Sequence, residues 1–241
     1  MISVCLATYN GSNFIERQLT SIVSQLTTSD EIVIVDDCST DDTIAIIERM
    51  HLPQVQVFKN AQNMGVIKSF EYGLSQCHGD IIFLSDQDDV WLPNKVKNVM
   101  EIFDQNPSVK LVLHDGQVVD NNLGLIADSW MRHKHLKASK SVQSIIIKNY
   151  FTGCMMAFKP EIREISLPFP NSIEMHDQWI GITTLINDPD SFYYLDQPLI
   201  QFVRHGSNLT DTHNRPLSVK IMGRLKLIWA ILQYRLKRVR K

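Results

Sequence analysis

Two carboxylates one residue apart, Asp86 and Asp88, come at the end of the apolar run DIIFLSD at residues 80–86. Carboxylates with this spacing can bind the same divalent cation, because Mg²⁺ or Mn²⁺ takes one or two carboxylates together with phosphate oxygens. A solvated acidic turn is the alternative, since Asp-rich turns are common without any ion. The tripeptide indicates a metal site and leaves that alternative open.

Polar side chains also follow three other short apolar runs, at residues 8–11, 36–39 and 60–65. Most of them are acids or amides, which suit a phosphate ligand only when a cation is also present. The pattern therefore favours a metal ion that bridges the protein to a phosphorylated ligand.

The segments that position these residues alternate between the two-residue period of strands and the 3.6-residue period of helices. Strands are predicted at residues 2–7, 31–37, 55–58 and 80–86, with helices at 15–26, 43–50 and 67–77. Strands separated by helix-length segments pair in parallel through right-handed crossovers, which predicts an α/β sheet with helices on both faces. Ligands bind beyond the carboxyl ends of such strands, where all four polar groups are expected.

Beyond residue 89 the alternation weakens. We expect a helix that opens near Pro93, strands at 110–115 and 151–158, a polar loop at 120–140 and a helix at 176–186. No linker divides the body.

Composition sets broad limits on the class of protein. With 241 residues, 44% hydrophobic and 21% charged, the chain is neither fibrous nor wholly disordered. It has no apolar run of about 18 residues and no secretory leader at its start, so we expect an intracellular protein. Its four cysteines form no CxxC pair, which predicts free thiols without zinc or disulfides.

The charge is unevenly distributed. Residues 220–241 hold eight Lys or Arg and no Asp or Glu, so a +8 tail is joined to a −10 body. In this tail, apolar residues share an arc of roughly 100° on a helical wheel; they are Ile221, Leu225, Ile228, Trp229, Leu232, Leu236 and Val239. We expect residues 217–241 to attach the protein to the anionic inner face of the cell membrane. The alternative is a helix packed on its own body or on a homodimer partner, whereas nucleic acid would be repelled by the acidic body.

Four motifs in order carry a family resemblance: ATYNG at 7–11, VDDCSTDDT at 35–43, NMG at 63–65 and LSDQDDVW at 84–91. Together they resemble the family 2 glycosyltransferases of the GT-A fold, strongly over residues 1–115 and more loosely to about 210. HDxW at 176–179 and the segment at 204–208 look most like bacterial polysaccharide-building enzymes, several of which are rhamnosyltransferases. The resemblance implies a Rossmann-like, mostly parallel sheet with a nucleotide-sugar half at 1–115, an acceptor half at 116–215 and an amphipathic helix at 216–241.

The resemblance also implies how the donor is held. The Ala7 backbone, Tyr9 and Asp37 would bind the nucleotide base, and a carboxylate at Asp37 can accept the imide N–H of uracil or thymine. UDP- or dTDP-sugars are therefore the expected donors, with dTDP-rhamnose the narrower prediction. Lys68 would lie near the nucleotide. The alternatives are a turn or cap carboxylate for Asp37 and a solvated side chain for Lys68.

The implied metal ligands for Mn²⁺ or Mg²⁺ are Asp86, which faces ribose or metal, Asp88 and His205. Relatives commonly read Tyr-Arg-x-His, whereas this chain reads Phe-Val-Arg-His at 202–205, so the histidine keeps its place and the arginine is displaced by one. Asp89 is expected to cap the helix near Pro93 or to support the loop.

On the acceptor side, the resemblance implies Asp177 as the general base of an inverting displacement, with Glu174 as the reserve candidate. A helix cap is the alternative for Asp177. Thr152, Gly153 and Trp179 would contact the acceptor, although Trp179 suits the core equally well. The acceptor is expected to be a glycan or a lipid-linked glycan.

Three other functions compete with this resemblance. Residues 86–90 also fit the DxDx[TV] motif of haloacid-dehalogenase-like phosphotransferases, but the motif follows the fourth strand and no Asp-Asp pair occurs after Asp89. A dinucleotide-dependent dehydrogenase would need GxGxxG after the first strand. A noncatalytic nucleotide-sugar-binding subunit stays open, and metal-dependent release of nucleotide separates it from an enzyme.

Overall fold

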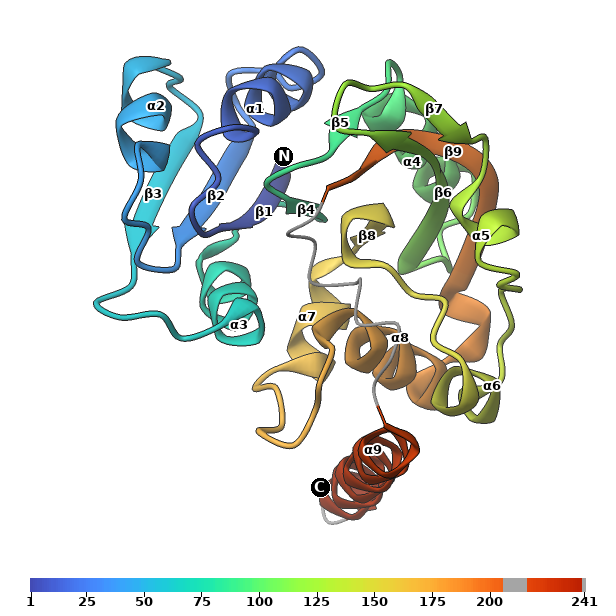
Figure 1. Ribbon diagram of the computed structural model, residues 1–241. Helices are drawn as coiled ribbons and strands as arrows, with labels where there is room; N and C mark the ends of the chain where they lie inside the picture. Colours follow the sequence, from blue (N-terminus) through green and yellow to red (C-terminus); the bar gives the residue numbers. More distant parts are fainter. Residues whose placement is uncertain (206–215, 240–241) are drawn as a thin grey trace.

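The computed structural model describes residues 1–205 and 216–239, which form one mixed sheet flanked by helices (Figure 1). Residues 206–208 of the polar segment at 204–208, and the last two residues of the basic tail, lie outside the described part. The order of strands along the sheet is β3-β2-β1-β4-β8-β6-β9-β5, with β7 paired to β6.

The first half of the sheet is parallel and follows the predicted alternation. Its strands are β1 (Ile2–Thr8), β2 (Glu31–Asp36), β3 (Val55–Lys59) and β4 (Ile81–Asp86). They are joined by α1 (Ile15–Val23), α2 (Thr43–Arg49) and α3 (Val66–Gln76). Figure 1 shows α1 and α2 on one face of these strands and α3 on the other. The register pairs Thr8 with Asp36 and Ala7 with Asp86, so the carboxyl ends meet at one edge as predicted.

The second half is mixed, because β8 (Met156–Phe158) runs antiparallel to both β4 and β6 (Leu111–Asp120). The long strand β9 (Phe192–Arg204), which was not predicted, lies parallel to β6 and antiparallel to β5 (Val90–Trp91). Its burial alternates irregularly along its length, so no simple period marks it in the sequence.

Two sequence-based predictions in this half were wrong. The expected loop at 120–140 contains strand β7 (Leu125–Ala127) and the short helix α5 (Trp130–His133), whose first turn is capped by Ser129. The expected strand at 151–158 contains a 3-10 turn, Gly153–Met155, before β8. The helix expected near Pro93 is α4 (Lys95–Gln105), which begins two residues later and has Asn94, with left-handed backbone, as its N-cap.

Helices α6 (Val142–Ile147), α7 (Pro160–Ser166) and α8 (His176–Asn187) cover the second half, and α8 matches its predicted range closely. The basic tail forms α9 (Leu217–Val239), which Figure 1 shows beside α8. The Tyr234 ring of α9 meets Trp179 of α8 edge-on at 5.6 Å, and Asn187 Nδ2 donates to the Tyr234 hydroxyl at 2.7 Å.

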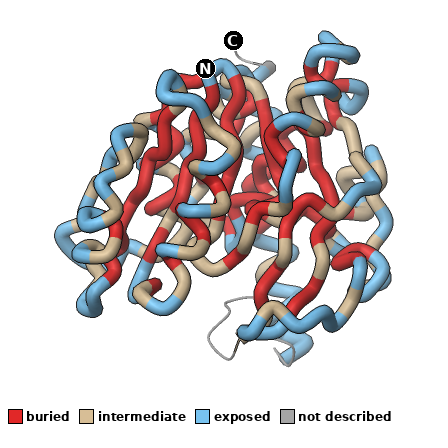
Figure 2. Tube along the Cα trace, turned by 90° about the horizontal axis from the view of Figure 1, so that it is seen from above, coloured by how far each residue is buried: buried red, intermediate tan, exposed pale blue. Residues whose placement is uncertain are grey.

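The core runs along the middle of the sheet, where β1, β2, β4, β6 and β8 are almost wholly buried, while the helices expose their outer sides (Figure 2). All four cysteines are free thiols. Among the described helices, none has the length and apolar character that crossing a bilayer requires.

Candidate active site

The loop after β1 is held to the acidic loop after β4 by Gln87. Its Oε1 accepts from Thr8 Oγ1 at 2.6 Å and from the Tyr9 backbone N–H at 2.9 Å, and its Nε2 donates to the Tyr9 carbonyl at 3.2 Å. A Cβ on Gly11 would lie 2.3 Å from Gln87 Oε1, so glycine is needed there for the close approach. The backbone of the half-exposed Tyr9 is thereby held beside the β4 end, where Ala7 pairs with Asp86.

Asp37 lies directly after β2 and organises a third loop. Its Oδ1 accepts from Asn60 Nδ2 at 2.8 Å and from the Met64 backbone N–H at 2.7 Å. Its Oδ2 accepts from the Gly65 N–H at 2.8 Å. Gly65 has a φ of +84°, which favours glycine at the start of α3. Asp37 therefore holds a turn together, which was the alternative to a contact with the nucleotide base. The contact with the base stays a prediction.

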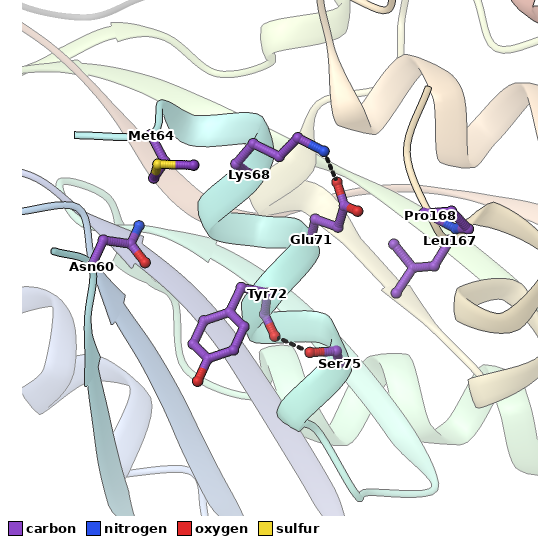
Figure 3. Close-up of a pocket in the computed structure, with 8 residues that line it drawn as sticks. All are labelled: Asn60, Met64, Lys68, Glu71, Tyr72, Ser75, Leu167 and Pro168. Carbon is purple, nitrogen blue, oxygen red and sulfur yellow. Dashed lines mark hydrogen bonds and ion pairs between the residues drawn. The ribbon is translucent and has the colours of Figure 1, made fainter. Parts of the chain in front are cut away.

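A cavity of about 490 Å³ opens beside this loop, between α3 and the segment after α7 (Figure 3). The eight residues that line it are Asn60, Met64, Lys68, Glu71, Tyr72, Ser75, Leu167 and Pro168. Lys68 Nζ pairs with Glu71 Oε2 at 2.7 Å. The predicted nucleotide contact of Lys68 therefore competes with an ion pair on its own helix, and none of the acidic residues after β4 lines this cavity.

Two of the residues predicted to share a metal ion, Asp88 and His205, are in contact although 117 positions separate them in the chain. His205 Nε2 lies 2.7 Å from Asp88 Oδ2, and the side chains are 9% and 15% exposed. The Phe14 ring stacks on the His205 imidazole, with centroids 4.5 Å apart and planes at 18°. Arg17 Nη2 donates to the Asp88 carbonyl at 3.4 Å, so α1 supports both members of the pair.

Asp86 and Asp177 bring further negative charge to the same place. Burial raises the pKa of Asp86 to about 7, and the charges of Asp88 and Asp177 act in the same direction. Burial likewise raises the pKa of the Asp177 carboxyl to about 7, against hydrogen bonds that favour its ionised form. Asp88 and Asp177 thus belong to one electrostatic group with Asp86, although 91 positions separate Asp177 from Asp86 in the chain.

Asp177 lies in the first turn of α8, where the helix dipole favours a carboxylate. Its Oδ1 accepts from the Gln178 N–H at 2.5 Å. The N-cap position belongs to Met175, so Asp177 is not the N-cap residue. Glu174, the reserve candidate, is exposed near α9, where its carboxylate lies within 3 Å of a Cβ placed on Gly223.

Asp89 is the most deeply buried acid of the loop after β4 and adjoins Asp86. It is 1% exposed, and its Oδ1 accepts from the Val203 N–H at 3.2 Å, so it supports the loop against β9 and does not cap α4. One group of residues that could hold a metal ion consists of Asp86, Asp89 and Cys154, whose candidate ligand atoms lie within 4.8 Å of one another. Burial raises the pKa of the Cys154 thiol well above its usual value, and a protonated thiol is a poor ligand for Mg²⁺ or Mn²⁺.

Lys95 lies fully buried beneath this group. Its Nζ donates to the Cys154 carbonyl at 2.8 Å and lies 4.1 Å from the centre of the Trp91 ring. Burial lowers the pKa of Lys95 to about 7, and the Asp89 and Asp86 charges oppose that shift. The lysine therefore provides a counter-charge on the protein side of the acidic loop.

The predicted acceptor residues divide into two kinds. Thr152 is half-buried, and a Cβ on the neighbouring Gly153 would lie 3.0 Å from His176 Nε2 and 3.9 Å from Asp177 Cβ, which places this backbone beside the candidate base. Trp179 is 1% exposed and donates from Nε1 to the Ser166 carbonyl at 3.0 Å. Its environment favours the core role that the sequence left open.

His176 stacks on Phe70, and burial keeps the imidazole neutral by lowering its pKa to about 3.

The acidic group fits a hard divalent cation. Asp88 and Asp86 supply carboxylate oxygens, and His205 supplies an imidazole nitrogen next to Asp88 Oδ2. The charges that disfavour ionisation of Asp86 would be relieved by a cation among them. Oxygen-rich donor sets with one imidazole suit Mn²⁺ or Mg²⁺.

Several supporting residues were missed by sequence reasoning. Gln87 lies inside the acidic motif and was read only as a spacer, while Phe14, Arg17, Lys95 and Cys154 carry no local signal because their roles depend on packing against distant segments.

The fold and the position of this acidic loop define the GT-A class of α/β transferases. The family model described as Glycosyl transferase family 2 matches residues 3–164, about two thirds of the chain, and the chain therefore belongs to this family. The resemblance, the fold class and the enzyme class predicted from the motifs are confirmed: the protein is a glycosyltransferase.

Two relatives illustrate the range of similarity. An uncharacterized glycosyltransferase of Haemophilus influenzae is 26% identical over 220 residues, which cover 89% of this chain and 73% of that protein. A dTDP-rhamnosyl transferase of Shigella flexneri, RfbG, is 36% identical over 103 residues, which cover 40% of this chain and 36% of the relative.

Two solved structures share the fold. S. aureus TarS in complex with UDP-GlcNAc superposes with a TM-score of 0.73 at 21% identity, over 94% of this chain and 65% of that one. The mannosyltransferase PcManGT of Pyrobaculum calidifontis, in complex with GDP-Man and Mn²⁺, gives 0.59 at 19% identity, over 100% of this chain and 64% of that one. The chain thus spans about two thirds of the length of each solved relative.

Proposed function

We propose that this glycosyltransferase moves a sugar from a UDP- or dTDP-sugar to a glycan or lipid-linked glycan in cell-surface polysaccharide synthesis, with inversion at the anomeric carbon. The observation that carries the proposal is the convergence of Asp86, Asp88 and His205 from one side and Asp177 from the other. The similarity to a dTDP-rhamnosyl transferase supports dTDP-rhamnose as the narrower donor.

In this proposal the base of the donor lies at the carboxyl ends of β1 and β2. The Ala7 backbone and Tyr9 flank it, and Asp37 accepts its imide N–H. Among the described residues, Asp37 Oδ2 accepts one hydrogen bond, from the Gly65 N–H, and the second lone pair on this oxygen is left for a ligand donor. Lys68 would have to exchange Glu71 for the diphosphate to contribute.

Asp86, Asp88 and His205 would hold Mn²⁺ or Mg²⁺. A bound divalent cation stabilises the negative charge that gathers on a leaving nucleoside diphosphate. Phe14 and Arg17 keep His205 and Asp88 in place for that task, and Lys95 neutralises part of the charge from behind.

Asp177 acts as the general base. A carboxylate whose pKa is near 7 is still mostly ionised in slightly alkaline solution and can accept a proton from the acceptor hydroxyl as that oxygen attacks the anomeric carbon. Thr152 and the Gly153 backbone border the acceptor beside Asp177. Burial excludes water from this carboxylate, which limits hydrolysis of the donor.

The experiment is a panel of UDP-, dTDP- and GDP-sugars, each with Mn²⁺ or with chelator, monitored by release of nucleoside diphosphate. The proposal expects metal-dependent release from UDP- or dTDP-sugars. Preference for a GDP-sugar would overturn the base assignment. Donor binding without any release, with or without acceptor glycans, would establish a noncatalytic binding protein instead.

A further inference from the structure

Helix α9 has an inner apolar face that joins it to the body. Leu227, Ala230 and Ile231 are buried, and Tyr234 completes the stripe against α8. Their spacing of three, four and seven residues places them on one side of the helix. This face buries apolar side chains of α9 against the body, and it contains none of the residues in the apolar arc predicted from the sequence.

The predicted arc forms a second apolar face, which we call the outer face. Its described members are all exposed, between 38% for Ile228 and 62% for Leu236. They are Ile221, Leu225, Ile228, Trp229, Leu232 and Leu236. With 100° per residue, they span roughly 100° on the side of the helix away from the inner face. The exposed Ile147 of α6 adjoins this face, because Arg224 Nη2 donates to its carbonyl at 2.8 Å.

Cations border the outer face on both sides. On the same wheel, Arg235 and Arg224 lie roughly 20–40° beyond one border and Lys226 and Lys237 roughly 60–80° beyond the other, whereas Arg238 falls on the inner side of the helix. No acidic residue occurs between positions 217 and 239. An apolar stripe with basic residues along both edges is the arrangement of a helix that lies in a lipid interface, since long cationic side chains reach up to the head groups.

We propose that the outer face of α9 inserts into the interfacial region of an anionic lipid surface. A second copy of this chain is the less suitable occupant, because pairing two such helices would bring cations against cations without a carboxylate to neutralise them. Anionic head groups supply that neutralisation to each basic residue near the surface.

The attachment would orient the reaction site. Helix α9 is fixed to α8 through Tyr234, Trp179 and Asn187, and the first turn of α8 carries Asp177. An acceptor held on a lipid carrier would then meet the general base near the membrane surface. This consequence rests on the proposed function, whereas the attachment itself does not.

The chain carries its own reporter for the test. Trp229 is 60% exposed, while Trp91, Trp130 and Trp179 are between 1% and 7% exposed. The full chain is mixed with vesicles of phosphatidylcholine alone, or of phosphatidylcholine and phosphatidylglycerol in equal parts, at low and high salt. Tryptophan emission and co-sedimentation are recorded. We expect a blue shift and sedimentation with the anionic vesicles at low salt, both weakened by salt.

Two matched variants locate the contact. Leu225→Ser with Leu232→Ser and Leu236→Ser should weaken vesicle binding roughly tenfold or more, because each leucine loses its apolar burial in the lipid. Leu125→Ser with Ile126→Ser, which changes exposed apolar residues on β7, should leave binding unchanged.

Three results would overturn the proposal: no shift and no sedimentation at low salt, equal binding to neutral and anionic vesicles, or a concentration-dependent dimer that shifts Trp229 emission without lipid. Because the assay contains neither donor, metal nor acceptor, its failure is distinguishable from failure of the proposed transfer, which is measured with soluble acceptors.

Discussion

The two halves of the sheet differ in how chain order relates to spatial order. In the first half, β1, β2, β3 and β4 are parallel, and each is joined by one helix to the strand that follows it along the chain. In the second half, β8, β6, β9 and β5 mix directions and come from segments as far apart as residues 90 and 204. The first half therefore builds a complete ligand edge from local βα units, whereas the second contributes single residues to that edge from distant positions.

This difference assigns different tasks to the halves. His205 and Asp177 are the residues that the second half brings to the acidic loop, one to contact Asp88 and the other to complete the buried acidic group. Changes in the first half should abolish donor binding together with transfer. A change at Asp177 should abolish transfer alone.

The largest expected effect is that of Asp88→Ala. Loss of this carboxylate should reduce transfer roughly 10³-fold and remove the metal dependence of donor binding, because the leaving diphosphate loses its electrostatic stabilisation. Nucleotide release and calorimetric donor binding measure the two effects. Asp104→Ala, at an exposed position of α4, is the control and should behave as wild type. Full activity of Asp88→Ala in excess chelator would contradict the metal assignment.

Asp177→Asn should impair transfer without impairing donor binding. It keeps the size of the side chain and removes its basicity, so kcat should fall roughly 10²-fold or more while donor affinity stays near that of wild type. Because the native pKa is raised to about 7, the ionised carboxyl costs native stability at pH 8, and the variant should melt at an equal or higher temperature there.

Glu174→Gln provides the matched control for this experiment, since Glu174 is exposed and lies three residues earlier. It should retain near-normal turnover. If Asp177→Asn kept more than about a tenth of wild-type turnover at saturating acceptor, Glu174 would become the residue to test.

The pH dependence of kcat tests the same role of Asp177 as general base. Asp177 has a pKa of about 7 in the metal-free protein, and a bound cation lowers it, so kcat should be level at alkaline pH and fall about tenfold per unit below the pKa of the complex. Measurements at saturating donor, acceptor and Mn²⁺ isolate the bound complex. The slope should be absent from the residual activity of Asp177→Asn, and an unchanged slope there would assign the titration to another group.

Phe14→Leu should produce the smallest effect and tests the contact between the halves. Stacking on His205 is worth about 0.5–1.5 kcal/mol, so its loss should weaken Mn²⁺ binding by about 2- to 10-fold. Titration of free Mn²⁺ by electron paramagnetic resonance measures this without turnover. Leu19→Met, in the buried core of the same helix, should leave metal affinity unchanged while reporting on general packing. Unaltered affinity in Phe14→Leu would remove Phe14 from the support of His205.

The sequence predicted the first half well because each element there carries its own signal. Strands β1, β2 and β4 are continuous buried apolar runs, and α1 and α3 bury one side, so periodicity places them within a few residues. Strand β9 was not predicted, because its burial depends on β6 and β5, and these strands lie beside it only in the folded chain.

The same reasoning applies to the candidate site. Asp88 and His205 were paired from motifs and lie in contact, because both directly follow strand segments that end at the same edge. Gln87, Phe14 and Lys95 could not be assigned, since a spacer, an aromatic and a lysine acquire their roles only from what packs against them. The apolar arc of α9 was correctly placed on one face, but the sequence could not show that another face does the packing.

The most direct test of the central claim is calorimetric titration of UDP and dTDP into the wild-type protein, once with Mn²⁺ and once with chelator. The account predicts binding of at least one of them that weakens roughly tenfold or more without metal, because Asp86, Asp88 and His205 hold the cation that meets the diphosphate. Equal affinity in both conditions, or no binding of either nucleotide, would contradict it.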